Sequence, residues 1–388
     1  LPGNYAVAET LPVGWELSDR VCDDPSGGTV VDVDTGIADI DLAAGETVTC
    51  TYQNAGVGTI VIAKETRPSG AGQAFDFTLT GETPFQLSDG GSQTFTDLAA
   101  GTYTATEALP AGWELTDLTC VDPSGGTTIS GTDATIDLAP GDLVTCTYTN
   151  TRLGSIVIEK TTDPVGAGTE FAFALTGQPA FRLADGESQT FADLPPGSYT
   201  ASEIVPAGWE LTGLICRDPS QDSTVDLASG RATIILAADE VVTCTYTNTQ
   251  LGSIVIVKDA SPAVGTRFPF QFEGQSFTLA NGESRRFDDL SPGRYDAMED
   301  VTAGWQLTAI TCTPGGAANI DLAGGTAVIA VGAGETVTCT YQNRTGGSLP
   351  STGSGSGIWT VLRIGGIILA LGLVLFGAAR RRRALRDG

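Results

Sequence analysis

Residues 101–115 read GTYTATEALPAGWEL, and close copies of this stretch recur along the chain. The copies read GNYAVAETLPVGWEL from Gly3, GSYTASEIVPAGWEL from Gly197 and GRYDAMEDVTAGWQL from Gly293. In each copy a run of alternating residues ends at a glycine-containing turn, which is the pattern of a half-buried strand. The sequence therefore predicts a repeated β-domain, and the repeat sets the organisation of the chain.

Two further signatures accompany the copies. A strand pattern ending in lysine occurs three times, as GTIVIAK to Lys64, GSIVIEK to Lys160 and GSIVIVK to Lys258. A closing pattern, VTCTY-x-N, ends at Asn54, Asn150, Asn248 and Asn343. The closing asparagines lie roughly 95 to 98 residues apart, which is the size of a self-standing sandwich domain.

These signatures divide the chain into repeats. We expect the C-terminal half of a truncated repeat at residues 1–54 and complete repeats at 55–151, 152–249 and 250–343. Because the chain opens in the middle of a repeat, we expect an N-terminal part to be missing. Within a repeat, about seven short runs rich in Val, Ile, Thr, Phe and Tyr are separated by turn sequences such as Asp89-Gly90. This spacing predicts an all-β, antiparallel sandwich.

Charge and composition exclude several classes of function. With 46 acidic and 20 basic residues and a formal net charge of -26, the chain repels nucleic acid, so we expect no nucleic-acid partner. It contains no histidine, which removes Ser-His-Asp catalysis, and no C-x-x-C. Calcium binding by the Asp-Gly turns is a weaker alternative to ordinary hairpin turns, because no dense D-x-D-x-D spacing occurs. We expect neither a metal nor a cofactor.

The eight cysteines fall into four pairs, one in each repeat, with about 26 to 28 residues between the partners. This regular spacing predicts one disulfide within each repeat, and the alternative is two buried free thiols per domain. The expected pairs are Cys22–Cys50, Cys120–Cys146, Cys216–Cys244 and Cys312–Cys339. Disulfides form in oxidising compartments, so we expect the repeats to lie outside the cytoplasm.

The C-terminal tail has the composition of a membrane anchor. After a linker at residues 344–357, residues 358–379 form an apolar stretch interrupted by Arg363 and long enough to cross a bilayer as a helix. Residues 380–388 form a basic tail, which the positive-inside rule places in the cytoplasm, with the repeats outside. The alternative, a buried core helix, is disfavoured because a β-sandwich array offers nothing to cover it.

A short motif lies within the linker. It reads Leu349-Pro350-Ser351-Thr352-Gly353. Together with the apolar stretch and the arginines that follow, it resembles the L-P-x-T-G sorting signal of sortase substrates in Gram-positive bacteria. The resemblance implies cleavage after Thr352 and transfer of that residue to an amine of cell-wall peptidoglycan or of a pilus subunit. The implied partners are a sortase, this acceptor and, before processing, the membrane.

Lysine occurs only in the first strand pattern of the complete repeats. The three positions are Lys64, Lys160 and Lys258. Residues i and i+2 of a strand share a face, so alternation shows where a side chain points. The lysine shares its face with two isoleucines, Glu107 shares one with a tyrosine, and Asn150 shares one with a tyrosine and a cysteine. The sequence therefore predicts that lysine, glutamate and asparagine point into the core from three strands.

Two interpretations fit such a group. A buried lysine and glutamate are costly unless they meet, so one interpretation is a salt bridge capped by the asparagine. The other is chemical, because desolvation lowers the pKa of lysine and raises that of glutamate. A neutral amine can then attack the carboxamide carbon while the protonated acid passes a proton to the departing ammonia. The product is an isopeptide bond between the first and last strands, and we favour this interpretation.

With these three parts in register, the repeats resemble the prealbumin-like domains of Gram-positive pilins and collagen-adhesin stalks, the SpaA-like or CnaB-like family. There the first strand ends V-x-K, the E-box reads Y-x-L-x-E-x-x-A-P-x-G-Y, and the last strand ends in asparagine; here the E-box runs from Tyr103 to Trp113. The resemblance implies tandem Ig-like or prealbumin-like sandwiches with the triads Lys64–Glu107–Asn150, Lys160–Glu203–Asn248 and Lys258–Glu299–Asn343. In the truncated repeat Glu9 and Asn54 remain without a lysine.

Three functions remain open at this point. We favour the structural stalk of a sortase-anchored surface protein or adhesin, which binds a host or matrix ligand through the missing N-terminal region. The alternatives are a basal or tip pilus subunit and a ligand-binding surface module. A shaft pilin is disfavoured because the W-x-x-x-V-x-V-Y-P-K motif does not occur in the sequence. We expect no enzyme activity on an external substrate, only self-catalysed isopeptide formation.

Overall fold

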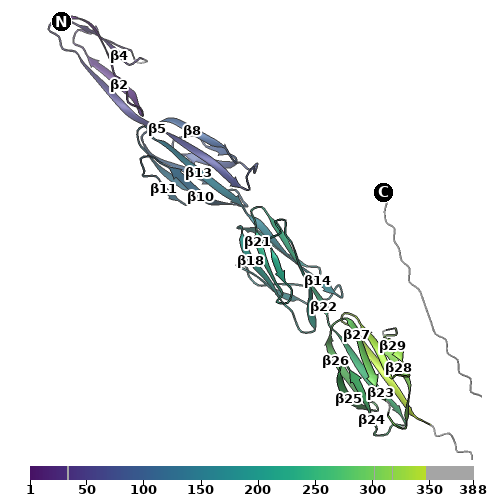
Figure 1. Cartoon of the computed structure of the whole chain (residues 1–388). Helices are drawn as coiled ribbons and strands as arrows, with labels where there is room; N and C mark the ends of the chain where they lie inside the picture. The colour runs from purple at the N-terminus through teal and green to yellow at the C-terminus, as the bar shows by residue number, and fades with distance from the viewer. Residues whose placement is uncertain (33–34, 301, 317, 347–388) are drawn as a thin grey trace, which may run out of the picture.

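The computed structural model describes residues 1–346 apart from 33–34, 301 and 317. In this part of the chain the regular secondary structure consists of β-strands, arranged in four units that follow one another in a line (Figure 1). The sorting motif at 349–353, the predicted membrane helix at 358–379 and the basic tail lie outside the described residues. Within the described residues, no helix has the length and apolarity needed to span a membrane.

The first, second and third units are the complete ones, which follow the shorter N-terminal unit in the row. Each is a sandwich of two sheets, as the second unit illustrates. Its first sheet has the order β17-β14-β22-β19, with bounds Ser188–Leu194, Gly154–Asp163, Val241–Gln250 and Trp209–Arg217. Its second sheet has the order β16-β15-β18-β21-β20, with bounds Phe181–Leu183, Phe171–Leu175, Gly197–Ile204, Arg231–Leu236 and Thr224–Asp226. The inner faces of the two sheets enclose the core, which confirms the predicted all-β sandwich.

The other two complete units repeat this plan. In the first of them β5 (Thr49–Arg67), β8 (Ser92–Ala99), β10 (Trp113–Val121) and β13 (Leu143–Arg152) face β6 (Phe75–Leu79), β7 (Phe85–Leu87), β9 (Gly101–Ala108), β11 (Thr128–Ser130) and β12 (Asp133–Leu138). In the last, β23 (Gly252–Ser261), β26 (Ser284–Leu290), β28 (Trp305–Thr313) and β31 (Thr336–Thr345) face β24 (Arg267–Phe272), β25 (Gln275–Ala280), β27 (Gly293–Glu299), β29 (Ala318–Asp321) and β30 (Thr326–Val331).

The unit at the N-terminal end holds fewer strands. A small sheet has the order β1-β4-β3, with bounds Gly3–Ala8, Ile37–Leu42 and Val30–Val31. The strand β2 (Trp15–Asp23) pairs with the first part of β5, and β5 then continues without interruption into the next unit. One strand therefore belongs to two consecutive units.

The first and last strands of each complete unit are parallel neighbours, whereas the other pairings within the unit are antiparallel. In the second unit Lys160 of β14 is opposite Tyr246 of β22, and Thr162 is opposite Asn248. The alternation of the sequence shows which face a residue occupies but not which strand it pairs with, so this parallel pairing is a finding of the structure. Because the two strands run the same way, the chain enters a unit at one end and leaves it at the other.

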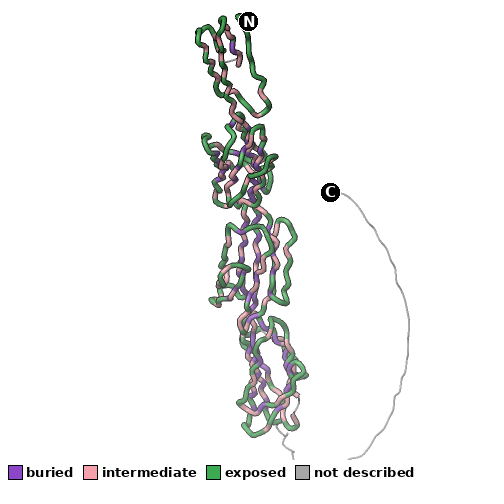
Figure 2. The backbone as a smooth tube through the Cα atoms, turned by 90° about the vertical axis from the view of Figure 1, so that its left-hand side faces the viewer, coloured by how far each residue is buried: buried purple, intermediate pink, exposed green. Residues whose placement is uncertain are grey.

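The core follows the predicted alternation. Along β14 the residues alternate between buried and partly exposed, with Ile156 and Ile158 fully buried on the inner face. Across the core, Phe171 packs edge-on against Trp209 with ring centroids 5.2 Å apart. Figure 2 shows the buried residues running along the inner strands of each complete unit while the loops are exposed. The sandwich therefore holds any inward-pointing polar residue in an apolar, dry environment.

Consecutive units are joined almost without a linker. Between β13 and β14 only Leu153 intervenes, and its N–H donates to the carbonyl of Gly112 at 2.9 Å. From the other side, the N–H of Asp239 donates to the carbonyl of Arg152 at 3.3 Å. The next junction repeats the first of these bonds, from Leu251 to the carbonyl of Gly208 at 2.9 Å. A turn of the preceding unit and a turn of the following one thus hold the connection.

Candidate functional site

The candidate site of each complete unit lies in the core, where the first and last strands meet a strand of the opposite sheet. In the second unit Lys160 lies on β14, Glu203 on β18 and Asn248 on β22. The structure brings together the predicted lysine, glutamate and asparagine in all three complete units, and each of these side chains is buried, with at most 8% of the residue exposed. The same strand pattern accounts for each position, because all three residues occupy inward-pointing registers.

An ion pair links the lysine and the glutamate in each group. The distance from Nζ to the nearest carboxylate oxygen is 3.6 Å for Lys64–Glu107, 3.9 Å for Lys160–Glu203 and 3.5 Å for Lys258–Glu299. In the third unit the asparagine closes the triangle, since Lys258 Nζ donates to Asn343 Oδ1 at 2.9 Å and Asn343 Nδ2 donates to Glu299 Oε1. The amine there already contacts the carboxamide.

The surroundings of the amine are apolar on one side. The ammonium nitrogen lies over a phenylalanine ring, 4.4 Å from the centroid of Phe75, 4.2 Å from that of Phe171 and 4.5 Å from that of Phe268 in the three units. These rings belong to the strand that follows the lysine strand. Sequence reasoning missed them, although the signal was present, because an F-x-F pattern opens this strand in every complete repeat.

The polar atoms of the first two groups are poorly satisfied. Both carboxylate oxygens of Glu107 and Glu203, and both carboxamide atoms of Asn150 and Asn248, lack a hydrogen bond of normal geometry in the described part of the chain. Burying a polar group without a hydrogen bond costs roughly 1–3 kcal/mol in proteins. The asparagine of each group nevertheless lies close enough to the glutamate to oppose the rise in its pKa.

Burial shifts the proton affinities in opposite directions. Desolvation lowers the pKa of all three lysines, against the opposing field of the paired glutamate, and it lowers that of Lys160 to about 8. Desolvation likewise raises the pKa of Glu107, Glu203 and Glu299. Both shifts favour the state in which the proton has moved from the amine to the carboxyl group. A neutral amine and a protonated acid are the forms needed for attack on a carboxamide.

Each of the four repeats also holds one disulfide. The four bonds join the predicted partners Cys22–Cys50, Cys120–Cys146, Cys216–Cys244 and Cys312–Cys339, so the described residues hold no free cysteine. In the second unit the two cysteines face each other across the antiparallel pair β19 and β22. The prediction of one disulfide per repeat is confirmed, and the alternative of buried free thiols is wrong.

The structure shows no cluster of His, Cys, Asp or Glu side chains suited to a metal ion among the described residues.

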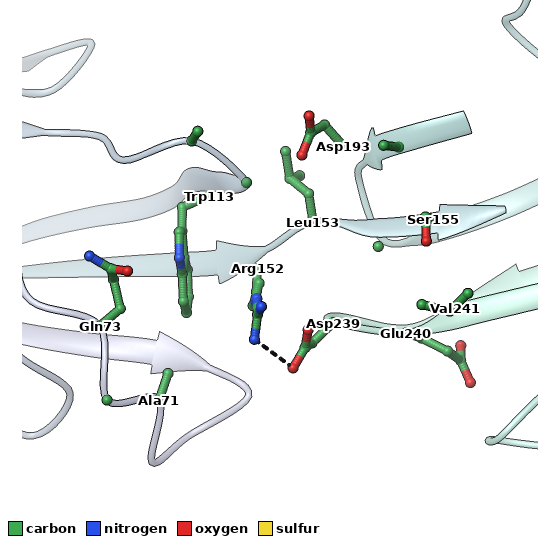
Figure 3. Close-up of a pocket in the computed structure, with 15 residues that line it drawn as sticks. Ala71, Gln73, Trp113, Arg152, Leu153, Ser155, Asp193, Asp239, Glu240 and Val241 are labelled. Atoms are coloured by element: carbon green, nitrogen blue, oxygen red, sulfur yellow. Dashed lines mark hydrogen bonds and ion pairs between the residues drawn. The ribbon is translucent and has the colours of Figure 1, made fainter. Parts of the chain in front are cut away.

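A cleft of about 490 Å³ lies at the junction of the first two complete units, where Trp113, Arg152 and Asp239 are among its lining residues (Figure 3). Arg152 Nη1 lies 3.0 Å from Asp239 Oδ2 across this junction, and both side chains are about half exposed. The pair connects two units, and an exposed pair of this kind adds at most about 1 kcal/mol.

Comparisons with known proteins find several solved structures of low sequence identity. Among solved structures, the Bacillus anthracis TIE protein is 14% identical over 88% of this chain and 68% of its own, with a TM-score of 0.32. The pilus adhesin SpaC of Lactobacillus rhamnosus GG is 12% identical over 89% of this chain and 57% of its own, with a TM-score of 0.29. A streptococcal ancillary pilin is 13% identical over 75% of this chain and 100% of its own, with a TM-score of 0.24. No curated protein sequence matches the chain.

A family model described as a prealbumin-like fold domain matches four segments of the chain. They are residues 1–56, 60–152, 156–250 and 254–345. Together these segments span nearly all of the residues that the structure describes, and each coincides with one unit of the row in Figure 1. The chain belongs to the family of prealbumin-like fold domains, of which it carries four repeats.

Proposed function

We propose that this chain is the structural stalk of a sortase-anchored bacterial surface protein or adhesin, stiffened by an isopeptide bond and a disulfide in each complete repeat. One observation carries the proposal. In three units arranged in a line, a buried lysine, glutamate and asparagine join the strand by which the chain enters to the strand by which it leaves.

The bond would form by a balanced transfer within each unit. The neutral amine of Lys160 attacks the side-chain carboxamide carbon of Asn248, forming a carbon–nitrogen bond. The protonated carboxyl group of Glu203 stabilises the carboxamide oxygen and supplies a proton to the departing nitrogen. Ammonia leaves, and the proton lost by the amine returns to the glutamate. No external substrate or cofactor takes part, so the chemistry is confined to the chain itself.

Parallel strands make this bond mechanically useful. Tension on the chain enters the second unit at Gly154, the start of β14, and leaves it at Gln250, the end of β22. A covalent bond from Lys160 to Asn248 lies late in both strands, so force would pass along β14, across the bond and out of the unit. The hairpins between these two residues would carry no load.

The junctions support a stalk as well. Residues 1–56 run into the first complete unit along β5, and each later unit follows the one before it after a single residue, Leu153 or Leu251. Backbone hydrogen bonds from both neighbouring units hold the connection. Flexible linkers in proteins are long and rich in glycine and serine, which these junctions are not. The row of units would therefore resist bending at the junctions as well as carry tension.

Anchoring rests on the tail sequence. In this proposal a sortase cleaves after Thr352 and joins it to an amine of peptidoglycan or of a pilus subunit, after the apolar stretch 358–379 has held the precursor in the membrane. The repeats then lie outside the cell, where their disulfides persist. A pilus-subunit acceptor would make the chain a minor pilus component, and a ligand would bind through residues beyond the N-terminal end of the row.

Pulling on a single molecule tests the stalk. Under reducing conditions the wild-type second unit should lengthen little, whereas Glu203→Ala should release about 90 residues between Lys160 and Asn248, or roughly 300 Å of extended chain. Glu170→Ala, which removes an exposed carboxyl group of the same unit, is the matched control. If wild type lengthened as far as Glu203→Ala, the proposed load path would be wrong.

A sorting experiment tests the anchor separately. In a sortase-positive Gram-positive host, protein extracted from the wall should end at Thr352 and carry an amine-linked fragment. Mass spectrometry of that fragment distinguishes a peptidoglycan acceptor from a pilin lysine. Deleting residues 349–353 should release the protein from the wall, and unchanged attachment after this deletion would contradict the proposal.

A further inference from the structure

A turn that connects the two sheets makes hydrogen bonds to the main chain of each buried lysine. In the second unit the turn at residues 184–187 connects β16 to β17. The N–H of Gly186 donates to the carbonyl of Lys160 at 2.9 Å, and the N–H of Lys160 donates to the carbonyl of Glu187 at 2.9 Å. Gly186 has a φ of +77°, which a residue with a Cβ adopts at a cost. We call this segment the lysine turn.

The aspartate of the lysine turn makes two more bonds to the same strand end. Asp185 Oδ1 accepts from the N–H of Thr162, and its Oδ2 accepts from the N–H of Gly166, each at 2.6 Å. These backbone bonds hold the pKa of Asp185 below its usual value, so the carboxylate stays ionised and keeps both acceptors. The sequence suggested that Asp-Gly pairs mark ordinary hairpin turns, and this contact with residues about 20 positions earlier was not visible in it.

The other complete units repeat the arrangement. In the first, the turn at 88–91 makes the same four bonds: Gly90 N–H to Lys64 O at 2.8 Å, Lys64 N–H to Gly91 O at 2.9 Å, and Thr66 and Gly70 N–H to Asp89 at 2.6 Å. In the third, the turn at 280–283 makes three: Gly282 N–H to Lys258 O at 2.9 Å, Lys258 N–H to Glu283 O at 3.0 Å, and Ala260 N–H to Asn281 Oδ1 at 2.7 Å. Asn281, which takes the place of the aspartate in this unit, accepts one such bond where each aspartate accepts two.

These bonds lie where the pairing of the lysine strand with its neighbour β17 stops. The ladder between β14 and β17 ends at Glu159 and Ser188, one residue before the lysine. The ladder with β22 holds the other edge of the strand as far as Asp163, so the lysine turn supplies the pairing of the lysine main chain on this edge. Attack on a carboxamide needs the reacting atoms about 3–3.5 Å apart, and a misplacement of about 1 Å can slow such a reaction about 100-fold.

We propose that Asp89, Asp185 and Asn281 are positioning residues for isopeptide formation, which fix the main chain of the reactive lysine through the lysine turn. They do not touch the reacting atoms, and they act through the strand that carries the amine. This inference rests on the proposed isopeptide chemistry and adds to it a group that lies outside the lysine, glutamate and asparagine.

The experiment follows bond formation with time in the full chain after cell-free synthesis. Intact mass counts ammonia losses, and peptide mapping assigns each branched peptide to its unit. Asp185→Ala should slow bond formation at Lys160 by roughly 10- to 100-fold and leave the bonds at Lys64 and Lys258 at their wild-type rates. Asp185→Asn should stay within a few-fold of wild type, because Asn281 serves naturally in the third unit.

The matched control is Asp218→Ala. Asp218 also accepts two backbone N–H bonds in a loop of the second unit, from Ser220 at 2.9 Å and Ser223 at 2.7 Å, but it does not contact the lysine strand. This variant should bond at the wild-type rate. Equal rates for Asp185→Ala and wild type, or equal slowing by Asp185→Ala and Asp218→Ala, would overturn the positioning role.

Folding is checked by the pairing of Cys216 with Cys244 in the same peptide maps. If Asp185→Ala fails to form this disulfide, the comparison moves to the third unit, where Asn281→Ala should slow bonding at Lys258 and Asn281→Asp should not. Bonding at the wild-type rate in Asn281→Ala would then overturn the inference. A wild-type chain that loses no ammonia at any time would instead remove the proposed isopeptide chemistry, so the two failures are distinguishable.

Discussion

The N-terminal unit and the complete units carry the same acid, amide and disulfide in different surroundings. In residues 1–56, Asn54 Nδ2 donates to Glu9 Oε1 at 2.8 Å, and Glu9 is exposed. In the second complete unit the equivalent Glu203 and Asn248 are buried in the core. The tryptophan of the repeated stretch shows the same contrast, with 41% of Trp15 exposed against 8% of Trp209.

This contrast indicates what shifts the proton affinities of the pair. The residue types alone give an ordinary surface hydrogen bond between a glutamate and an asparagine. The lysine strand and the strands packed beside it turn the same pair into a desolvated group with shifted pKa values. In the proposed chemistry the sandwich is the activating element, and residues 1–56 serve as an internal control, because the described residues place no lysine beside Asn54.

The largest expected difference between these regions is covalent. The intact mass of the reduced chain should fall short of its sequence by three ammonias, about 17 Da each, one for each complete unit and none for residues 1–54. High-resolution mass spectrometry of reduced protein measures this directly. A mass equal to that of the sequence would leave the buried salt bridge as the remaining interpretation.

The next prediction removes the acid from one unit. Glu203→Gln keeps the size of the side chain but cannot supply the proton, so the second unit should lose no ammonia while the other two still do. Without the bond, a loop of about 90 residues is no longer closed, which should lower the free energy of unfolding of that unit by about 4–5 kcal/mol. Peptide-resolved hydrogen exchange reports the unit concerned, and Glu170→Gln is the control. Bond formation at Lys160 in Glu203→Gln would rule out the acid's role.

Much of this site could be predicted from the sequence, because a strand pattern has period two. Lys160 shares its strand face with Ile156 and Ile158, which places it in the core. The cysteine spacing predicts the four disulfides. The alternation of residues does not show which strands pair with each other. The parallel pairing of β14 with β22 joins segments distant in sequence, which local pattern does not encode.

The turn at Asp185 shows a second limit. A D-G pair predicts a tight turn correctly, since Gly186 takes the left-handed conformation such turns require. The pattern does not reveal that the carboxylate caps the end of another strand. The sorting motif at 349–353 and the apolar stretch 358–379 stay predictions from sequence, because they lie outside the described residues.

A smaller contrast concerns the disulfides. In residues 1–56, Cys22–Cys50 is the sole predicted cross-link, and removing it should destabilise that unit by about 3–4 kcal/mol in the chain-entropy model. In the second complete unit the bond from Lys160 to Asn248 already encloses Cys216–Cys244, so removal there should have a smaller effect. Hydrogen exchange of the Cys50→Ser and Cys244→Ser variants, each with its partner also replaced, compares the two. Equal effects would mean that the complete unit has no second cross-link.

The smallest predicted effect depends on pH and concerns a unit that cannot form its bond. Asn248→Ala leaves Lys160 as a free buried amine, whose pKa of about 8 in the folded state lies below its ordinary value of 10.5. Between these two pH values the unfolded chain binds more protons than the folded one, so stability rises with pH across this window. For Glu203 the sign is opposite, because its pKa is raised on folding. Stability from the glutamate is therefore present at low pH and is lost as pH rises through its folded pKa.

Raising the pH from 7.5 to 9.5 should therefore stabilise the second unit of Asn248→Ala by about 2 kcal/mol, since one pKa unit corresponds to about 1.4 kcal/mol. The urea midpoint of that unit, followed by hydrogen exchange in β22, measures the change. In wild type the proposed bond would make the amine an amide that does not titrate, so the same rise in pH should leave the midpoint unchanged apart from effects shared by both proteins. An equal rise in both would show that Lys160 stays a free amine in wild type, because only a titrating amine couples folding to pH in this window.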